Sequence, residues 1–214
     1  MVFKLTKDSY LFPPPALADP DGLLAYGGDL CETRLLIAYS NGIFPWYNPG
    51  DEILWWCPRE RFVIFPNEIH ISNSMKKFLQ KNTYETKIDA DFSQIIKTCR
   101  KLREGKTWLT DEMEAAYNTL FKSGYVLCVG VYDKNGELVG GLYGVFLGRC
   151  FFGESMFSTA PNASKAALIF LCNELAKRNF AFIDCQFYTP HLQSMGGRFI
   201  SWHEYRRLLR EGLQ

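Results

Sequence analysis

In residues 61–214, some apolar residues occur in continuous or alternating runs and others recur every three or four positions. The first pattern predicts strands and the second predicts helices. Continuous or alternating runs of apolar, β-branched and aromatic residues predict strands at 62–65, 84–88, 125–132, 138–147, 150–156 and 181–186. Apolar residues three or four positions apart, bounded by capping residues, predict helices at 72–80, 91–102, 110–124, 163–178 and 202–209. This order of elements favours an α+β fold in which helices flank a mixed sheet.

The first 60 residues follow a different pattern, because turn formers dominate them. Prolines, glycines, asparagines and aspartates cluster at 12–15, 19–22, 27–29 and 45–50, so little regular structure is expected between them. One helix is predicted from Asp29, with Glu32 as its capping partner, to a stop at 41–42. We therefore predict a small N-terminal domain over residues 1–60 and a larger domain over residues 61–214.

Composition narrows the class of protein. A content of 47% hydrophobic and 22% charged residues is typical of a globular protein. The longest apolar stretches, such as 166–172, are far shorter than the roughly 18 residues of a membrane span. The N-terminus lacks a secretory pattern and the seven cysteines form no Cys-x-x-Cys pair, so we expect a cytoplasmic protein with reduced thiols. The three histidines have no ligand spacing, and no metal site is expected.

Charge is unevenly distributed along the chain. Residues 1–60 carry four basic and eight acidic side chains, whereas residues 61–214 carry 20 and 15, so the second part is the basic one. Two clusters account for much of this excess: Lys76, Lys77 and Lys81, and then Lys97, Arg100, Lys101, Arg103 and Lys106. They are either solvated helix faces or a surface for a polyanion such as RNA.

Glu154 is the first candidate for chemistry, since it interrupts a strand rich in phenylalanine. Burying a carboxylate among aromatic rings is costly unless the carboxylate has a partner or a role. Either Glu154 pairs with a base, for which Arg149 and Lys165 are the nearest in sequence, or it belongs to a functional site.

Asp184 and Gln186 form the second candidate. Strand alternation places both side chains on one face, where a carboxylate and an amide could hold a nucleophile and orient a carbonyl group. The alternative is an edge strand that shows a polar face to water. Cys185 falls on the opposite face by the same alternation, so we do not expect it to act as a nucleophile in that site.

Five ordered motifs resemble the bacterial leucyl/phenylalanyl-tRNA-protein transferases. They are Gly-Leu-Leu-Ala-Tyr-Gly-Gly-Asp-Leu at 22–30, Gly-Ile-Phe-Pro-Trp at 42–46, Leu-Trp-Trp-Cys-Pro-Arg at 54–59, Gly-Glu-Ser-Met-Phe-Ser at 153–158 and Ile-Asp-Cys-Gln at 183–186. The resemblance runs from about Phe12 to Arg207 and is weaker around 198–202.

This resemblance implies a function and a fold. Such an enzyme moves leucine, phenylalanine or sometimes methionine from aminoacyl-tRNA to the N-terminal arginine or lysine of a protein, and so marks that protein for degradation by the N-end rule. It is cytoplasmic, uses no cofactor, and has a C-terminal domain with a GNAT-like acyltransferase fold. Leucyl-tRNA, phenylalanyl-tRNA and the acceptor proteins are its implied partners.

The resemblance also implies roles for individual residues. Asp184 and Gln186 match the positions proposed to drive peptide-bond formation, and Glu154 matches a glutamate in the same site. The pocket for the transferred amino acid maps onto Leu142, Phe151, Met156, Leu171 and Ile183. At Leu142 and Leu171 this chain departs from the methionine and phenylalanine of the family pattern, which leaves the depth of the pocket open.

Contacts to the terminal adenosine of the tRNA map onto Tyr39, Trp46, Trp108 and Tyr117. Aromatic faces stack on bases, which gives these contacts a physical basis, and core or interdomain packing is the alternative for each ring. The two basic clusters are expected to bind tRNA phosphates.

Two rival functions stay open at this stage. A CoA-dependent GNAT-type N-acetyltransferase would need a glycine-rich turn before the helix at 163–178, yet residues 158–163 contain no glycine and include Pro161. This disfavours CoA as a cofactor. The other rival is a tRNA-binding module without catalytic activity.

Overall fold

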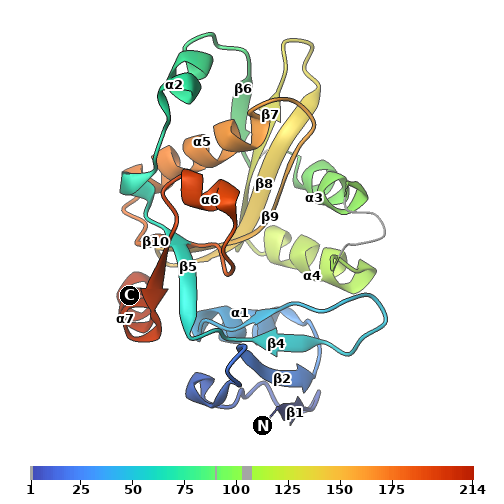
Figure 1. Ribbon diagram of the computed structural model, residues 1–214. Helices are drawn as coiled ribbons and strands as arrows, with labels where there is room; N and C mark the ends of the chain where they lie inside the picture. Colours follow the sequence, from blue (N-terminus) through green and yellow to red (C-terminus); the bar gives the residue numbers. More distant parts are fainter. Residues whose placement is uncertain (1, 90, 103–107) are drawn as a thin grey trace.

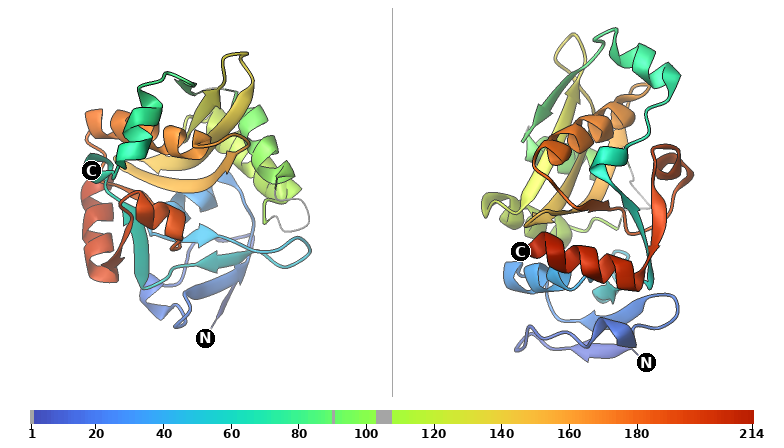
Figure 2. Two further views of the ribbon diagram at one scale, coloured as in Figure 1. Left: turned by 45° about the horizontal axis from the view of Figure 1, so that its top comes forward. Right: turned by 90° about the vertical axis from the view of Figure 1, so that its left-hand side faces the viewer.

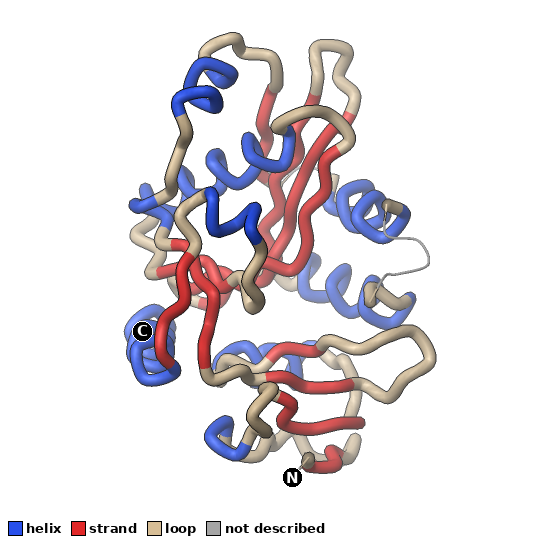
Figure 3. Tube along the Cα trace, viewed as in Figure 1, coloured by secondary structure: helices blue, strands red, loops and turns tan. Residues whose placement is uncertain are grey.

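The computed structural model describes residues 2–89, 91–102 and 108–214. Its strands form two sheets, of which the larger has seven strands in the order β11-β5-β10-β9-β8-β7-β6 and the smaller has four in the order β1-β2-β4-β3 (Figure 1). The smaller sheet lies below the larger one in Figure 3, with loops on both sides of it.

The smaller sheet was not expected from the sequence. It contains β1 (Phe3–Leu5), β2 (Leu23–Gly27), β3 (Phe44–Pro45) and β4 (Leu54–Trp56), together with a short 3₁₀ turn at Pro15–Leu17. Strands this short, set among turn formers, give no alternation that sequence reasoning can detect. The predicted helix exists as α1 (Glu32–Ser40), but it starts three residues after Asp29, whose carboxylate accepts a hydrogen bond from Arg34 Nε at 3.2 Å.

The larger sheet confirms the mixed topology. Its strands are β5 (Glu60–Ile64), β6 (Glu85–Ile88), β7 (Val126–Tyr132), β8 (Leu138–Leu147), β9 (Cys150–Ser158), β10 (Phe182–Asp184) and β11 (Arg198–Ser201). Strands β7, β8 and β9 form an antiparallel meander, whereas β10 pairs with β9 in parallel and with β5 in antiparallel fashion. The parallel step is made by the long helix α5 (Ala163–Lys177), as the order of elements predicts.

Helices cover both faces of the larger sheet (Figure 2). On one face lie α5 and α2 (Asn73–Leu79), and on the other lie α3 (Phe92–Lys101) and α4 (Asp111–Lys122). Helices α6 (Pro190–Ser194) and α7 (Trp202–Leu213) follow β10 and β11. Ser72, Thr110 and Ser201 cap α2, α4 and α7, and each accepts a hydrogen bond from a backbone N–H in the first turn. The predicted α+β fold, with a mixed sheet flanked by helices, is therefore confirmed.

The hydrophobic core continues from one sheet to the other. One cluster of buried residues joins Leu24 and Trp55 of the smaller sheet to Val63, Tyr117 and Phe152 of the larger part. The boundary between residues 60 and 61 stays a prediction, and it coincides with the start of β5 at Glu60. Within the described ranges, no helix is both long enough and apolar enough to cross a lipid bilayer.

Candidate active site

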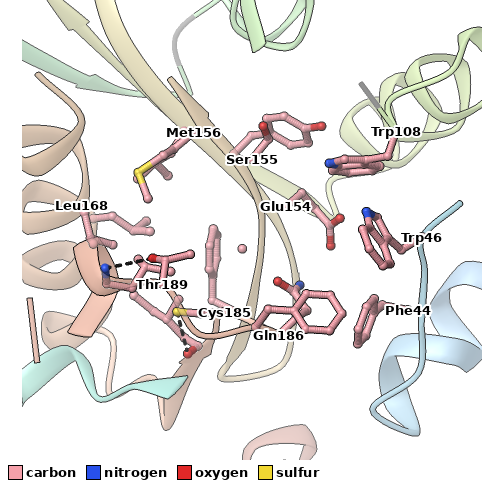
Figure 4. Close-up of a pocket in the computed structure, with 18 of the residues that line it drawn as sticks. Phe44, Trp46, Trp108, Glu154, Ser155, Met156, Leu168, Cys185, Gln186 and Thr189 are labelled. Carbon is pink, nitrogen blue, oxygen red and sulfur yellow. Dashed lines mark hydrogen bonds between the residues drawn. The ribbon is translucent and has the colours of Figure 1, made fainter. Parts of the chain in front are cut away.

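A cavity of about 420 Å³ opens between β9, β10, α5 and the loop that follows β3 (Figure 4). Its walls are predominantly apolar. The lining residues used below are Phe44, Trp46, Trp108, Leu142, Phe151, Glu154, Met156, Leu168, Leu171, Ile183, Cys185, Gln186, Phe187, Thr189 and Leu192. A pocket of this size, with a few polar groups among apolar walls, is typical of a small-molecule or cofactor site.

The structure brings most of the predicted substrate-binding residues into this cavity. The five predicted for the amino-acid pocket all line it, and they are Leu142, Phe151, Met156, Leu171 and Ile183. In Figure 4, Trp46 and Trp108 lie on the side away from Met156 and Leu168, with Glu154 and Gln186 near them. The cavity thus has an apolar end and a tryptophan end.

Sequence reasoning missed several lining residues: Phe44, Leu168, Phe187, Thr189 and Leu192. Only Leu168 had a usable signal, because it lies one helical turn before Leu171 on α5. Thr189 and Leu192 belong to the start of α6, a five-residue helix that no sequence pattern indicated.

Glu154 occupies a β-bulge. Ser155 pairs with Tyr143 of β8 and Gly153 pairs with Gly144, so Glu154 is an extra residue without a partner across the ladder. A bulge of this kind bends the strand and redirects the side chain of the extra residue. The register shift therefore explains how a carboxylate on a core strand comes to line the cavity.

Two tyrosine hydroxyls hold the Glu154 carboxylate. Tyr39 of α1 donates a hydrogen bond to Oε1 at 2.7 Å, and Tyr117 of α4 donates to Oε2 at 2.6 Å. Burial raises the pKa of Glu154 from 4.5 to about 7, although the two hydrogen bonds lower it. The alternative in which Glu154 pairs with Arg149 is wrong, because the Arg149 side chain instead donates to the Glu211 carbonyl at 2.7 Å.

Tyr39 and Tyr117 have a different place from the one expected by resemblance. Both rings are 0% exposed, and their hydroxyl oxygens lie 3.0 Å apart beneath the cavity wall. Neither ring offers a free face on which a base could stack, so the direct contact with adenosine is not supported by this geometry. The geometry instead favours the alternative that both rings pack in the core, with their hydroxyls directed at Glu154.

Asp184 lies behind the cavity wall and is 0% exposed. Its carboxylate accepts hydrogen bonds from Arg61 Nε at 3.3 Å, from Arg61 Nη2, and from the Tyr205 hydroxyl at 2.7 Å. Arg61 is itself 1% exposed and donates a further hydrogen bond to the Gly42 carbonyl at 2.6 Å. The resulting ion pair ties the loop before β3 to β5, β10 and α7.

Gln186 is positioned by Asp184, but not in the way strand alternation predicts. Strand β10 ends at Asp184, and Gln186 adopts a left-handed backbone conformation with φ of 56°. Its backbone N–H donates to Asp184 Oδ1 at 2.9 Å. A non-glycine residue in this region is uncommon and persists when its surroundings hold it there.

This turn also changes the expectation for Cys185. The prediction that Cys185 faces away from Gln186 is wrong, since both residues line the cavity while Asp184 lies beneath it. Burial raises the pKa of the Cys185 thiol well above its ordinary value, so the sulfur stays protonated. A neutral thiol is a poor nucleophile, and the rejection of Cys185 therefore stands on a different argument.

The two basic clusters lie over opposite faces of the larger sheet. Lys76, Lys77 and Lys81 are exposed on and just after α2, while Lys97, Arg100 and Lys101 belong to α3. Arg100 forms ion pairs with Asp111 at 2.5 Å and Glu114 at 3.0 Å. Arg103 and Lys106 lie outside the described residues. One RNA helix lying against one face of the sheet would thus meet only one of the clusters.

In the ranges that the structure describes, no group of three or more His, Cys, Asp or Glu residues is arranged so that it could hold a metal ion.

Comparisons with known proteins identify the family of this chain. The family model described as leucyl/phenylalanyl-tRNA protein transferase matches residues 63–210, and the model for the N-terminal domain of that transferase matches residues 28–59. The leucyl/phenylalanyl-tRNA–protein transferase of Syntrophus aciditrophicus is 52% identical over 208 residues, covering 95% of this chain and 86% of that protein. The enzyme of Pseudomonas entomophila is 50% identical over 209 residues, covering 96% and 92%.

Among solved structures, L-PGS from Bacillus licheniformis aligns with 79% of this chain and 57% of that chain. The sequence identity is 10% and the TM-score is 0.44, which is too low to carry an argument. The family models, and the relatives that share about half of their residues with this chain, are sufficient by themselves to assign the family. This chain belongs to the leucyl/phenylalanyl-tRNA protein transferase family.

Proposed function

We propose that this protein transfers leucine or phenylalanine, with methionine as a further substrate, from aminoacyl-tRNA to the N-terminal arginine or lysine of acceptor proteins in the cytoplasm. The products would then be marked for degradation. The observation that carries the proposal is the cavity itself, where an apolar end and a tryptophan end meet beside Glu154 and Gln186.

The apolar end suits the side chain of the transferred amino acid. Leu142, Met156 and Leu171 contribute flexible or branched hydrocarbon, and Phe151 and Ile183 complete the wall. Transfer of an apolar side chain from water into such surroundings contributes roughly 25 cal/mol for each Å² of surface buried. A charged or strongly polar amino acid would lose its hydration there without compensation.

The tryptophan end suits the terminal adenosine. Trp46 is 41% exposed, so it can present a ring face, and its place is fixed by neighbours. Its ring centroid lies 5.6 Å from Trp56 and 5.4 Å from Phe187, and the Trp56 indole N–H donates to the Trp46 carbonyl at 2.6 Å. A preorganised aromatic face is an effective platform for a base.

Trp46→Ala should weaken the binding of uncharged tRNA by about 1–3 kcal/mol, because one base loses its stacking partner. The affinity is measured by fluorescence anisotropy with the wild-type protein and the variant. The same tRNA without its terminal adenosine is the control, and with it the two proteins should bind equally. An identical affinity of both proteins for intact tRNA would contradict the assignment.

The proposed chemistry requires positioning more than activation. An aminoacyl ester is already activated, so the site has to orient an α-amino group toward the ester carbonyl and stabilise the oxyanion that forms. We assign the orientation of this amine to Gln186, which is held by Asp184 and, through it, by Arg61. Glu154 would face the positive charge of the acceptor's N-terminal residue.

The rival functions are less compatible with this geometry. At the start of α5 the Ser164 N–H donates to the Ser158 hydroxyl at 3.3 Å, and Pro161 supplies no donor in the turn. That end of α5 therefore presents fewer N–H groups to a pyrophosphate than a CoA site needs. If the protein only bound RNA, the buried Arg61–Asp184 ion pair that positions Gln186 in the cavity would have no evident purpose.

One assay separates the three functions. Purified protein is incubated with tRNA charged with labelled leucine and a peptide that begins with arginine, and the peptide is analysed by mass spectrometry. The proposal predicts addition of one leucine residue to peptides that begin with arginine or lysine, and none to a peptide that begins with alanine. Acetylation from acetyl-CoA, or binding of tRNA without transfer, would reject the proposal in favour of the corresponding rival.

We propose that the lysines on and just after α2 contact phosphates of the acceptor stem. We favour Lys76, Lys77 and Lys81 because Arg100 in the other cluster is already paired with Asp111 and Glu114. Replacing the three lysines with glutamine should reduce the slope of log affinity against log salt by roughly 0.7–0.9 for each phosphate that is no longer neutralised. A Lys97→Gln/Lys101→Gln variant is the control on the opposite face and should retain the wild-type slope. An unchanged slope in the triple variant would identify α2 as a solvated face.

A further inference from the structure

The proposed reaction releases a proton that the site must accept. The acceptor arrives mostly as an α-ammonium group, whose pKa is about 7.7–8.0, and only the neutral amine can attack the ester. Asp184 is unsuited to this task, since four donors from Arg61, Tyr205 and Gln186 already occupy its two oxygens. The amide of Gln186 is not a base. Among the described residues that line the cavity, Glu154 is the one carboxylate.

The hydrogen bonds around Glu154 can rearrange to accept one more proton. Three oxygen–oxygen distances close a ring: 2.7 Å from Tyr39 to Oε1, 2.6 Å from Tyr117 to Oε2 and 3.0 Å between the two hydroxyls. While Glu154 is ionised, two hydroxyl protons serve these three contacts. A proton added to Oε2 would let Glu154 donate to Tyr117, Tyr117 donate to Tyr39, and Tyr39 donate to Oε1. All three contacts are then hydrogen bonds, but the two bonds to the ionised carboxylate are charge-assisted and stronger, so the tyrosines on balance lower the pKa of Glu154.

We propose that Glu154, with the hydroxyls of Tyr39 and Tyr117, is the proton acceptor of the transfer reaction and takes one proton from the acceptor's α-ammonium group. This inference rests on the proposed function and deepens it, since it gives Glu154 a chemical role beyond attraction of a positive charge. Tyr39 and Tyr117 are positioning residues, because they are buried and act through Glu154.

The step balances in protons and electrons. Glu154 takes one proton from the ammonium group, and the nitrogen lone pair then forms a bond to the ester carbon while the carbonyl electrons move to oxygen. When the tetrahedral intermediate collapses, the bond to the tRNA 3′ oxygen breaks. The second proton of the nitrogen goes to that oxygen, so the products are an amide, a free 3′ hydroxyl and a neutral Glu154, which returns its proton to water.

The electrostatic surroundings support this role. Burial raises the pKa of Glu154 to about 7, close to the working pH, which suits a group that accepts and then releases a proton. Tyr39 and Tyr117 have pKa values raised well above 10 and stay protonated as donors. Within residues 2–89, 91–102 and 108–214, the further titratable or charged groups that influence this cluster are Tyr143 on β8, Asp184 on β10 and Arg61 on β5. Asp184 raises the pKa of Glu154 and Arg61 lowers it.

Tyrosine-to-phenylalanine substitutions test the cluster without changing its shape. Tyr39→Phe and Tyr117→Phe each remove a donor to the ionised carboxylate, so each should raise the pKa of Glu154 by about one unit. Tyr205→Phe is the matched control, because it removes a buried hydroxyl from Asp184 instead. Circular dichroism establishes that each variant is folded.

Two readouts are compared in the same variants. Carbon-13 NMR of labelled glutamate carboxyls follows the titration of Glu154, whose signal is the one missing from Glu154→Gln. The pH profile of kcat/KM for leucine transfer follows the reaction. In the wild type we expect kcat/KM to fall below about pH 7, where Glu154 becomes protonated. This acid limb should move up by about one pH unit in Tyr39→Phe and Tyr117→Phe. It should stay in place in Tyr205→Phe and be absent from Glu154→Gln. In Glu154→Gln only the limb of the peptide's own amine, near pH 8, should remain.

The outcomes separate this inference from the function on which it rests. A Glu154 signal that titrates near pH 4.5 overturns the inference, as does an acid limb that stays in place while the carboxyl pKa moves. In both cases leucine transfer by the wild-type protein leaves the proposed function intact. Absence of transfer by the wild-type protein rejects the function and this inference together.

Discussion

Arg61→Met should lower the free energy of unfolding by about 3–5 kcal/mol, because the substitution leaves the Asp184 carboxylate buried without its counterion. The side chains of Arg61 and Asp184 are 1% and 0% exposed, so water cannot replace the missing charge. Leucine transfer should also fall strongly, since Gln186 loses the support of a fixed Asp184. Urea unfolding followed by circular dichroism measures the first effect, and the labelled-leucine assay measures the second.

Two further variants make this prediction specific. Arg198→Met breaks an ion pair with Glu68 in which both side chains are about half exposed, and it should cost no more than about 1 kcal/mol. The double variant Arg61→Met/Asp184→Asn removes both buried charges, so it should recover much of the stability while transfer stays low. Equal stability losses in Arg61→Met and Arg198→Met would contradict the role given to the buried pair.

Leu171→Trp should make the cavity selective for leucine over phenylalanine. Leu171 lines the apolar end, and a tryptophan there, larger than the phenylalanine of the family pattern, would occupy volume that the larger substrate needs. We expect kcat/KM for phenylalanine transfer to fall relative to leucine transfer by about 10- to 200-fold, the range for one pocket contact worth 1–3 kcal/mol. Competition between the two charged tRNAs for one acceptor peptide measures the ratio.

Leu175→Trp is the matched control for this prediction. Leu175 is buried one turn further along α5 and is not among the lining residues of the cavity. Its substitution overpacks the same helix, at about 1–3 kcal/mol of stability, without entering the pocket. The leucine-to-phenylalanine ratio should stay at the wild-type value. A ratio that changes equally in both variants would mean that the amino acid does not bind at Leu171.

Long, regular patterns made the core of the fold predictable. The meander from Val126 to Ser158 and the helix α5 have continuous apolar runs, a clear Asn-Gly turn and whole turns of helix, so their local preferences agree with the final structure. The strands of the smaller sheet have two to five residues and depend on pairing with distant segments. No local pattern records that pairing.

The site was predictable as a set of residues but not as an arrangement. Resemblance identified Glu154, Asp184 and Gln186, whereas alternation placed Asp184 and Gln186 on one face of a strand that in fact ends at Asp184. Tyr39 lies 115 positions from Glu154 in sequence, and Arg61 lies 123 positions from Asp184. Contacts of this kind follow from the packing of α1 and β5 against β9 and β10, which a single sequence does not reveal.

The bulge at Glu154 is likewise a feature that a single sequence does not reveal. Regular alternation along β9 gives no indication that Glu154 is an extra residue, since the shift exists only in the register with β8. Apart from the family resemblance, the signal that marked the position was the costly burial of a carboxylate among aromatic residues. This cost indicated that Glu154 needed a partner or a role, and the partners are two tyrosines from the helices α1 and α4.

The most direct test of the proposed function is a crystal structure with 3′-phenylalanylamino-3′-deoxyadenosine, in which a stable amide replaces the reactive ester. We expect the phenyl ring at the apolar end among Leu142, Met156 and Leu171, the adenine against Trp46 or Trp108, and the carbonyl carbon between Glu154 and Gln186. A phenyl ring at the tryptophan end, or a ligand bound outside the cavity, would contradict the proposed function.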